Sequence, residues 1–513
     1  MLKENAGLTG LPDPLTLCSE VDRRHLAREA WEESGGSARA LGRFLDRLDH
    51  LKASNLSGSR PGPAEEDFLS AFEAYQERLK TLGMVDLSDL EVETLRLFQE
   101  HPEVAAARAQ RHPWVFVDEY QDTNRIQADI LKEMARGGEV SICAIGDPDQ
   151  AIYGFRGAQV ENFHRFSEDF EGARRVVLTR NYRSTQTICD AAAAVMGSPR
   201  PLDAQSHTSA PLLFSACRTE AEEAEMIVEQ VEKRIGGTTY FSLDSGRVES
   251  HEGDRDLGLG DLAGLFRLNA MGDALEEAFH RAGIPVARSG EKPLIHRFPA
   301  DILWRFFQVL QSPENSYYRE RYRAVAAARG IREVTDFGAF QMTLSPHEAL
   351  ETALEHHRIS PETEEARRVL DRLRELTAGA GPDLGAFLES LCLDRGIDHT
   401  ALPGDRVTLM SLHAAKGLEW PVVFIVGCEE GLLPLTLYGE TMEAEERRLF
   451  YVGITRARHT VVFSHAARRA LNGRVLRADP SPYLSHIPQT LMEPLERSGP
   501  RHAGRAHKQL TLF

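Results

Sequence analysis

The stretch VFVDEYQD, residues 115–122, decides the fold of this chain of 513 residues. Three apolar residues that lead into two adjacent carboxylates predict a buried strand that delivers Asp118 and Glu119 to its carboxyl end. At such a position an aspartate can hold Mg²⁺, and a glutamate can polarise a water for attack on a γ-phosphate. Taken alone, an acidic strand end can equally have no catalytic task.

Two further short apolar runs follow the first one and also end in polar residues. Residues 140–145 lead into Gly146-Asp147, and residues 175–178 precede NYRS at 181–184. Apolar runs of this length between helical stretches predict buried parallel strands of an α/β sheet. Ligands of such sheets bind at the carboxyl ends of the strands, so we expect these polar residues to face a ligand.

A second set of apolar runs lies later in the chain and predicts a second α/β domain. These runs are residues 262–266, 407–411, 422–426 and 460–463. A helical, charged block near residues 296–404 interrupts them. Residues 15–55 and 64–100 also have helical spacing, and the Gly- and Pro-containing segment 58–63 separates them.

The composition excludes several classes of protein. Hydrophobic residues make up 42% and charged residues 27%, which is typical of a folded globular chain. No stretch approaches the roughly 20 apolar residues of a membrane helix, and the N-terminus lacks a secretory signal. Six scattered cysteines without zinc-ligand spacing predict reduced thiols in a cytoplasmic protein. The net charge of −18 means that any nucleic-acid contact must use a local basic channel.

Five motifs occur in a fixed order and together resemble one family. After residues 115–122 come GDPDQAIYGFRGA at 146–158, NYRS at 181–184, LHAAKGLE at 412–419 and EERRLFYVGITRAR at 445–458. In this order they resemble motifs II to VI of the UvrD/Rep/PcrA family, the superfamily 1 DNA helicases that move 3′ to 5′ and act in repair or replication. The resemblance runs from roughly residue 15 to 470. It implies an α/β fold with tandem RecA-like motor domains of the P-loop NTPase class and helical insertions.

The resemblance also assigns roles to single residues, with ATP and Mg²⁺ as cofactors. Asp118 would bind Mg²⁺ and Glu119 would be the catalytic base. Gln150 would sense the γ-phosphate, and Arg183 and Arg456 would stabilise charge on the transferring phosphoryl group. The other nucleotide contacts would be Tyr182 on the adenine, Glu419 on the ribose, and Gly417. Outside this context, both arginines would be read as ordinary salt-bridge partners.

Motifs III and V would contact DNA. The residues implied by the resemblance are Tyr153, Phe155, Arg156 and His413. A base stacked on an aromatic ring gains about 1–3 kcal/mol without sequence readout. The family usually has tryptophan where this chain has Phe155, and the alternative is that Phe155 is a core residue.

The sequence contains no Walker A loop. No G-x-x-x-x-G-K-[ST] occurs, and none of the eight lysines follows a glycine. Residues 84–90 resemble the segment that leads into motif II, so we expect the chain to begin after the missing motifs, with its first motor domain truncated at the N-terminus. One lost transition-state donor already costs about 3–4 kcal/mol, which predicts a poor ATPase.

Two explanations stay open. In the first, the chain is a fragment whose Walker A half is encoded separately or lost, so that a separate chain bearing that loop would be a partner. The rival is a non-hydrolysing adaptor that binds DNA and the sliding clamp on a helicase scaffold.

The resemblance predicts five segments. Residues 1–100 would form a helical 1B-like insert, and residues 101–190 the remainder of the first RecA-like domain. Residues 191–295 and 405–490 would form the second RecA-like domain, interrupted by a reduced 2B-like insert at 296–404. Residues 491–513 would be a flexible basic tail.

The chain ends in QLTLF, which resembles the sliding-clamp-binding pentapeptide of bacteria. Gln509 would hydrogen-bond at the rim of an apolar groove, which Leu510, Leu512 and Phe513 would fill. Each buried large side chain contributes about 1.5–3 kcal/mol and ordering the tail costs about 2–5 kcal/mol, which predicts micromolar binding. The alternative is an accidental apolar tail.

Overall fold

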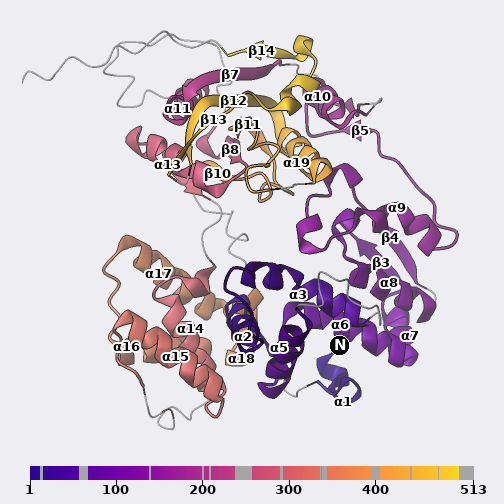
Figure 1. Cartoon of the computed structure of the whole chain (residues 1–513), viewed down its shortest axis with the longest axis vertical. Coiled ribbons are helices and arrows are strands. Elements are labelled where there is room, and N and C mark those ends of the chain that lie inside the picture. Colours follow the sequence, from indigo (N-terminus) through magenta and orange to yellow (C-terminus); the bar gives the residue numbers. More distant parts are fainter. Residues whose placement is uncertain are drawn as a thin grey trace, which may run out of the picture. The chain divides into compact units, whose positions relative to one another are not determined.

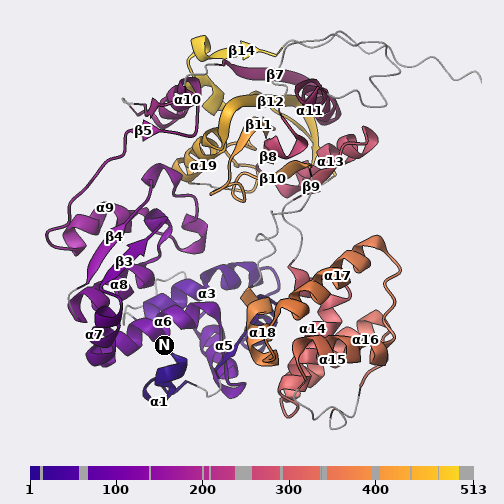
Figure 2. The same cartoon turned by 180° about the vertical axis from the view of Figure 1, so that it is seen from behind.

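The computed structural model describes most of the chain, which forms two compact units. The described residues are 1–11, 15–56, 68–137, 140–198, 201–206, 210–236, 257–288, 293–334, 337, 344–393, 405–439, 442–471 and 473–495. One unit consists of Met1–Val176 and Glu291–Ala401, the other of Val177–Gly290 and Leu402–Phe513. Figure 1 shows the elements coloured along the sequence, and Figure 2 shows them from behind. Within the described ranges, no helix has the length and apolarity to cross a membrane.

The N-terminal part of the first unit is helical, as the spacing of its apolar residues predicts. Its elements are α1 (Ala6–Thr9), β1 (Thr16–Leu17), α2 (Glu20–Glu33), α3 (Leu41–Leu56), α5 (Leu69–Thr81), β2 (Met84–Val85), α6 (Leu87–Glu100) and α7 (Pro102–Arg111). Helix α6 begins at a capping box, in which Asp86 and Asp89 each accept a hydrogen bond from the other's backbone. Helix α7 begins with a proline, which suits a first helical position.

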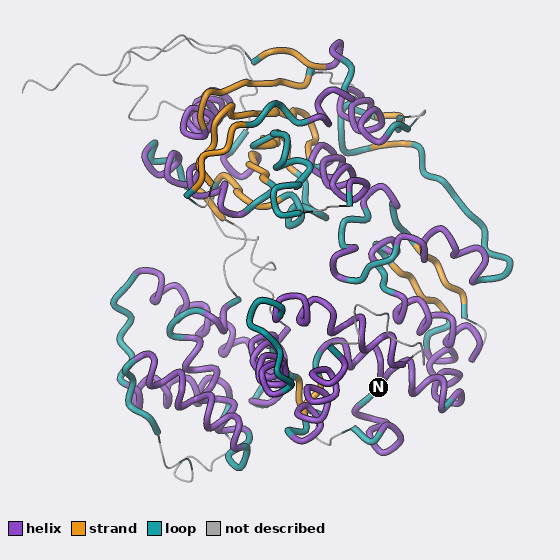
Figure 3. The backbone as a smooth tube through the Cα atoms, in the orientation of Figure 1, coloured by secondary structure: helices purple, strands orange, loops and turns teal. Residues whose placement is uncertain are grey.

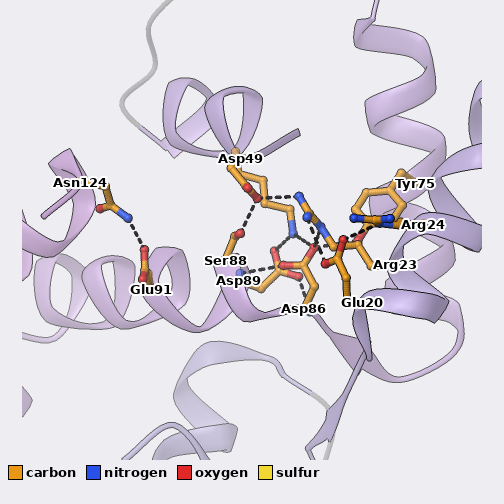
Figure 4. Close-up of polar contacts among 11 residues, drawn as sticks. Glu20, Arg23, Arg24, Asp49, Tyr75, Asp86, Ser88, Asp89, Glu91 and Asn124 are labelled. Carbon is orange, nitrogen blue, oxygen red and sulfur yellow. Dashed lines mark hydrogen bonds and ion pairs between the residues drawn. The ribbon is translucent and has the colours of Figure 1, made fainter. Parts of the chain in front are cut away.

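A buried lysine draws four of these helices together. Lys52 Nζ lies 2.6 Å from Asp86 Oδ2 and 2.5 Å from Asp89 Oδ1. Tyr75 Oη donates to Asp86 at 2.7 Å, and Arg23 Nε lies 3.6 Å from the same carboxylate (Figure 4). Burial raises the pKa of Asp86, but the charges of Lys52 and Arg23 outweigh burial and lower the pKa to about 2.

The second helical block of this unit packs on the first block. Its helices are α14 (Ala300–Gln311), α15 (Ser316–Arg329), α16 (Pro346–His357), α17 (Glu364–Gly379) and α18 (Leu384–Leu393). One hydrophobic core contains residues of both blocks, among them Trp31, Phe44, Phe72, Phe306 and Phe307. Within it, Arg305 and Tyr317 donate to buried Asp22 at 2.7 and 2.8 Å. Helical blocks far apart in the sequence therefore share one core.

The first unit also contains a two-stranded parallel sheet. Strand β3 (Trp114–Val117) pairs in parallel with β4 (Ser141–Ala144), as the sequence predicts, but the prediction that these strands are buried is wrong for the described chain, since neither strand has a buried residue. Helix α8 (Arg125–Gly137) connects them, and α9 (Val160–Asp169) follows. Trp114 and Phe116 are 70% and 69% exposed, so one face of this sheet presents large apolar side chains to solvent.

The third predicted strand, residues 175–178, does not form. These residues have no regular secondary structure, and Val176 and Leu178 are 81% and 79% exposed. A strand needs a neighbour that takes its backbone hydrogen bonds, and in the described part of the chain the pairing begins only at β5 (Arg180–Asn181), which joins β6 (Asp203–Ala204).

The second unit contains an eight-stranded sheet (Figure 3). Its order is β14 (Met492–Pro494), β7 (Leu212–Thr219), β12 (Ala457–Leu471), β11 (Trp420–Val426), β8 (Leu262–Phe266), β10 (Val407–Ser411) and β9 (Val286–Arg288). These strands pair in parallel, and β13 (Arg474–Arg477) joins β12 as an antiparallel hairpin. All four strands predicted for the second α/β domain are present, so the α/β fold class is confirmed.

Helices and a buried ion cluster complete the second unit. Its helices are α10 (Gln186–Met196), α11 (Glu220–Ile235), α13 (Gly272–Arg281) and α19 (Glu443–Thr455). Every residue of β8 is buried, as expected for a central parallel strand. Arg469 of β12 lies 2.5 Å from both Glu223 of α11 and Glu429, which follows β11. This cluster joins two strands and a helix across the interior of the unit.

Candidate functional site

The acidic stretch of the first unit lies where β3 ends. The backbone N–H of Ile145 donates to Val117 O at 2.8 Å, and that of Tyr120 donates to Ile145 O at 2.9 Å. These bonds continue the pairing past the ends of both strands. Between them Glu119 has a φ of 51°, in the left-handed region that non-glycine residues rarely occupy. Such strain is frequent at functional sites.

Gln121 connects the two acidic motifs of this unit. Its side chain is fully buried, donates to Glu119 Oε2 and accepts a hydrogen bond from the backbone N–H of Asp147 at 3.0 Å. Gln150 donates to Asp147 Oδ2 at 2.9 Å. The structure therefore links Glu119 to Gln150 through Gln121 and Asp147.

Sequence reasoning did not single out Gln121. The sequence feature that relates to Gln121 is Gly146, the glycine directly after the second strand. In the structure, a Cβ at Gly146 would lie 2.2 Å from Gln121 Oε1. The glycine therefore makes room for the glutamine amide beside the strand ends.

An open hollow of about 430 Å³ lies beside the acidic residues. Its lining includes Asp118, Glu119, Asp122, Thr123 and Gln127. Mg²⁺ in nucleotide sites is usually bound by one or two carboxylates plus phosphates and waters, so exposed Asp118 suits it. Within the described residues, no group of three or more metal-binding side chains forms a complete protein cage.

The motif III residues form an aromatic cluster in which Phe155 is exposed and Tyr153 is half-buried. The Arg156 guanidinium carbon lies 5.3 Å from the ring centre of Tyr153 and 5.4 Å from that of Phe155. Phe155 is 62% exposed, so the alternative reading of Phe155 as a core residue is wrong. Exposed aromatic rings beside a guanidinium provide faces on which nucleic-acid bases can stack.

In the second unit, motif IV is fixed to motif VI. Asn181 Oδ1 accepts hydrogen bonds from the backbone N–H groups of Arg183 and Ser184, both at 2.8 Å. Ser184 Oγ donates to Ala457 O at 2.7 Å, and the backbone N–H of Thr185 donates to Arg458 O at 3.1 Å. The turn therefore has a defined place beside the start of β12, with the Tyr182 ring 77% exposed on it.

Glu419 of motif V lies between two arginines. Arg458 Nε and Nη2 donate to Glu419 Oε1 at 3.0 and 2.5 Å, and Arg183 Nε forms an ion pair with Oε2. Partial burial raises the pKa of Glu419, but the hydrogen bonds and charges of Arg458 and Arg183 outweigh burial and hold the pKa below its usual value. The carboxylate is therefore ionised at neutral pH.

Arg456 lies beneath this surface and is only 1% exposed. Its guanidinium donates to Val452 O at 3.1 Å, Leu418 O at 3.2 Å and Thr455 Oγ1 at 3.2 Å. The backbone N–H of Trp420 donates to Arg456 O at 2.9 Å. In this structure Arg456 holds the end of α19 against the segment that enters β11.

His413 and Gly417 lie on the turn after β10. The turn is fixed by the backbone N–H of Leu412, which donates to Phe266 O at 2.8 Å. Gly417 has a φ of +83°, which glycine adopts without strain. His413 is half-buried at the start of the turn, and Glu419 follows Gly417 by two residues.

The structure thus gathers the predicted site residues at strand ends of each unit. The first unit holds Asp118, Glu119 and Gln150, together with the motif III cluster. The second unit holds Tyr182, Arg183, Gly417, Glu419, Arg456 and His413. The predicted clamp-binding residues, Gln509, Leu510, Leu512 and Phe513, lie outside the described residues.

Comparisons with known proteins agree with this order of motifs. The UvrD/REP helicase N-terminal domain model matches residues 21–171, and the UvrD-like helicase C-terminal domain model matches residues 176–322 and 348–468. The ATP-dependent DNA helicase PcrA of Staphylococcus aureus is 28% identical over 570 aligned positions, which cover 96% of this chain and 75% of that protein. The PcrA of Leuconostoc citreum is 29% identical, with 87% and 66% covered.

Proposed function

Because the chain belongs to the UvrD-like helicase family, we propose that it acts as an ATP-dependent DNA helicase that moves 3′ to 5′. The observation that carries the proposal is the strand end at Asp118 and Glu119, which Gln121 ties to Asp147 and Gln150. An adaptor that only binds DNA has no physical need for a strained Glu119 beside a glutamine sensor.

The first unit would supply the chemistry at the γ-phosphate. Asp118 would hold Mg²⁺, which when bound neutralises part of the negative charge of the phosphates. Glu119 would orient the attacking water and take its proton, and Gln121 keeps the Glu119 carboxylate in place. Gln150 would sense whether the γ-phosphate is present.

The second unit would bind the rest of the nucleotide. Exposed Tyr182 offers a ring face to the adenine, and ionised Glu419 offers oxygens to the ribose hydroxyls. Arg183 is 37% exposed, and its guanidinium would offer several donors to phosphate oxygens. We also assign Arg456 to the transferring phosphoryl group, a role for which its buried guanidinium must leave the carbonyl oxygens of Val452 and Leu418.

The DNA contacts would come from the motif III cluster and from His413. The Tyr153 and Phe155 rings can stack on unpaired bases, and Arg156 adds a positive charge for the backbone. Such contacts read no sequence, which suits a motor that steps along any strand.

The protein would act in the cytoplasm, and none of its six cysteines forms a disulfide.

We further propose a Walker A-bearing polypeptide as the partner of the β3–β4 sheet. Parallel strands are normally covered on both faces, yet Trp114 and Phe116 are 70% and 69% exposed. In a βαβ segment, the helix would cover this face and the strands would extend the sheet in parallel. The phosphate-binding loop at the end of such a strand would then lie at the same edge as Asp118, because the carboxyl ends of parallel strands lie together.

The sliding clamp is a second proposed partner, through the peptide at residues 509–513. A labelled peptide with this sequence should bind the clamp saturably, and the Leu512→Ala peptide should not. A flat titration with the unchanged peptide would remove this partner from the proposal.

Strand displacement tests the proposed function. The chain, mixed with a Walker A-bearing βαβ polypeptide, ATP and Mg²⁺, should unwind a duplex with a 3′ single-stranded tail and leave one with a 5′ tail intact. Glu119→Gln should abolish displacement but keep DNA binding, since it removes only the base. If the unchanged chain in this mixture binds DNA but shows no ATP-dependent displacement, the adaptor is favoured instead.

A further inference from the structure

Arg458 is a charged residue of the candidate site that the motifs leave without a task. It lies at the start of β12, two residues after Arg456, and its guanidinium forms two hydrogen bonds to one oxygen of Glu419. Arg183 occupies the other oxygen. Both oxygens of this carboxylate therefore have an arginine partner in the chain without nucleotide.

The backbone fixes the three residues beside one another. The turn that carries Arg183 is bonded to the start of β12 through Ser184 and Thr185, and Trp420, next to Glu419, is bonded to Arg456 O. Their side chains remain accessible, with exposed fractions of 30% for Glu419, 37% for Arg183 and 46% for Arg458. Arg458, unlike Arg456, therefore faces solvent at this edge.

We propose that Arg458 is a positioning residue for a nucleoside triphosphate, because it holds Glu419 in place when Arg183 leaves the carboxylate for the γ-phosphate. This inference rests on the proposed function. In this structure one oxygen of Glu419 pairs with Arg183 and the other oxygen pairs with Arg458. After Arg183 moves, Arg458 remains as the counter-charge that keeps Glu419 ionised and aimed at the ribose.

The proposed role of Arg458 affects the affinity for ATP more than the affinity for ADP. Without Arg458, Arg183 is the only positive partner of Glu419 among the contacts of the described residues. Transfer of Arg183 to a γ-phosphate would then leave the carboxylate uncompensated. ADP has no γ-phosphate and makes no such demand on Arg183. The loss of Arg458 should therefore weaken ATP binding more than ADP binding, whereas a general loss of structure would weaken both equally.

Calorimetric titrations of the full chain with Mg-ATP and Mg-ADP at pH 7.5 test the proposal. Arg458→Ala should reduce the preference for ATP over ADP by about fivefold, the size of one partly exposed ion pair. Arg458→Lys keeps one charge contact and should restore most of the preference. Arg218→Ala is the matched control, since Arg218 is an exposed arginine of the same unit that pairs with Glu222, and it should change nothing.

The outcomes separate this inference from the proposed function. An unchanged ATP preference in Arg458→Ala, or an equal loss for both nucleotides, would overturn the positioning role while the nucleotide site stands. A lysine variant as weak as the alanine variant would also contradict it. If the unchanged chain binds neither nucleotide even when the Walker A-bearing polypeptide is present, the proposed nucleotide site itself is wrong, and the role of Arg458 is wrong with it.

Discussion

Strand β11 in the second unit and strand β3 in the first unit differ in how far the described chain covers their apolar side chains. Phe424 and Ile425 of β11 are 1% and 0% exposed, between neighbouring strands on both edges. Trp114 and Phe116 of β3 are mostly exposed, and β3 has only β4 beside it. A two-stranded sheet is marginal by itself. The described part of the second unit therefore buries the apolar side chains of its sheet, whereas that of the first unit leaves one face of the β3–β4 sheet exposed.

The largest loss of stability should come from a substitution in the buried sheet of the second unit. Phe424→Ala removes a fully buried ring and should destabilise the second unit by about 3–5 kcal/mol. Hydrogen exchange of the β11 amides at increasing urea concentration measures the stability of this unit. A loss below about 1 kcal/mol, the size of an ordinary substitution, would show that the sheet tolerates a cavity and would break the comparison.

The helical core of the first unit should also lose stability on substitution, in this case because a buried charge loses its partner. Burial raises the pKa of Asp22, but Arg305, Ser19 and Tyr317 outweigh it and leave the pKa lowered. Asp22→Asn leaves Arg305 buried without its charge partner and should cost about 3 kcal/mol at pH 7.

The pH dependence of this effect has a definite sign. A carboxyl group with a lowered folded pKa stabilises the protein above its unfolded pKa, and the stabilisation is lost as the pH falls through the folded pKa. The gap in stability between the unchanged chain and Asp22→Asn should therefore shrink below about pH 4. Chemical unfolding at several pH values measures it, and a gap that widens in acid would contradict the assignment.

An intermediate effect is expected at the acidic edge. Gly146→Ala places a Cβ 2.2 Å from Gln121 Oε1, and overpacking of this kind costs about 1–3 kcal/mol. Hydrogen exchange of the β3–β4 amides should become faster, and Gln121→Ala in the same chain should reverse part of the change. Equal exchange in Gly146→Ala and the unchanged chain would mean that the Gln121 side chain moves aside without cost.

The smallest effect is expected at the exposed face. Phe116→Ala should change the stability of the first unit by no more than about 0.5 kcal/mol, because its ring is already in contact with water. The same substitution should weaken the binding of a Walker A-bearing polypeptide, which hydrogen exchange of β3 in its presence detects. A stability loss as large as that of Phe424→Ala would show that Phe116 is packed in solution.

Part of this comparison could be predicted from the sequence. Continuous apolar runs such as residues 262–266 predicted the buried strands, because a central parallel strand needs apolar side chains on both faces. Residues 175–178 also contain three consecutive apolar residues but formed no strand, since pairing depends on a neighbour that composition does not reveal. The motifs also predict Asp118 and Glu119 at a strand end, which is where they lie in the structure.

Other features could not be predicted, since they depend on contacts between distant residues. Arg305 and Asp22 are 283 positions apart, and nothing in either local sequence indicates that the two helical blocks share a core. Gln121 and Arg458 lie inside quoted motifs, yet their tasks depend on the atoms that they contact, Glu119 and Glu419. Motif spacing predicts where a strand ends, and side-chain contacts decide what the neighbouring residues do.

The most direct test of the central claim is the rate of ATP hydrolysis with saturating single-stranded DNA, measured for the chain alone and with a Walker A-bearing βαβ polypeptide. The claim is that the first unit carries the acidic half of the site but lacks the phosphate-binding half. The added polypeptide should raise the rate by about 10²-fold or more, since a lost transition-state donor alone costs that much, and Glu119→Gln should remove the gain. Turnover of about one per second or faster by the chain alone, a rate within the usual range of enzymes, would contradict the account.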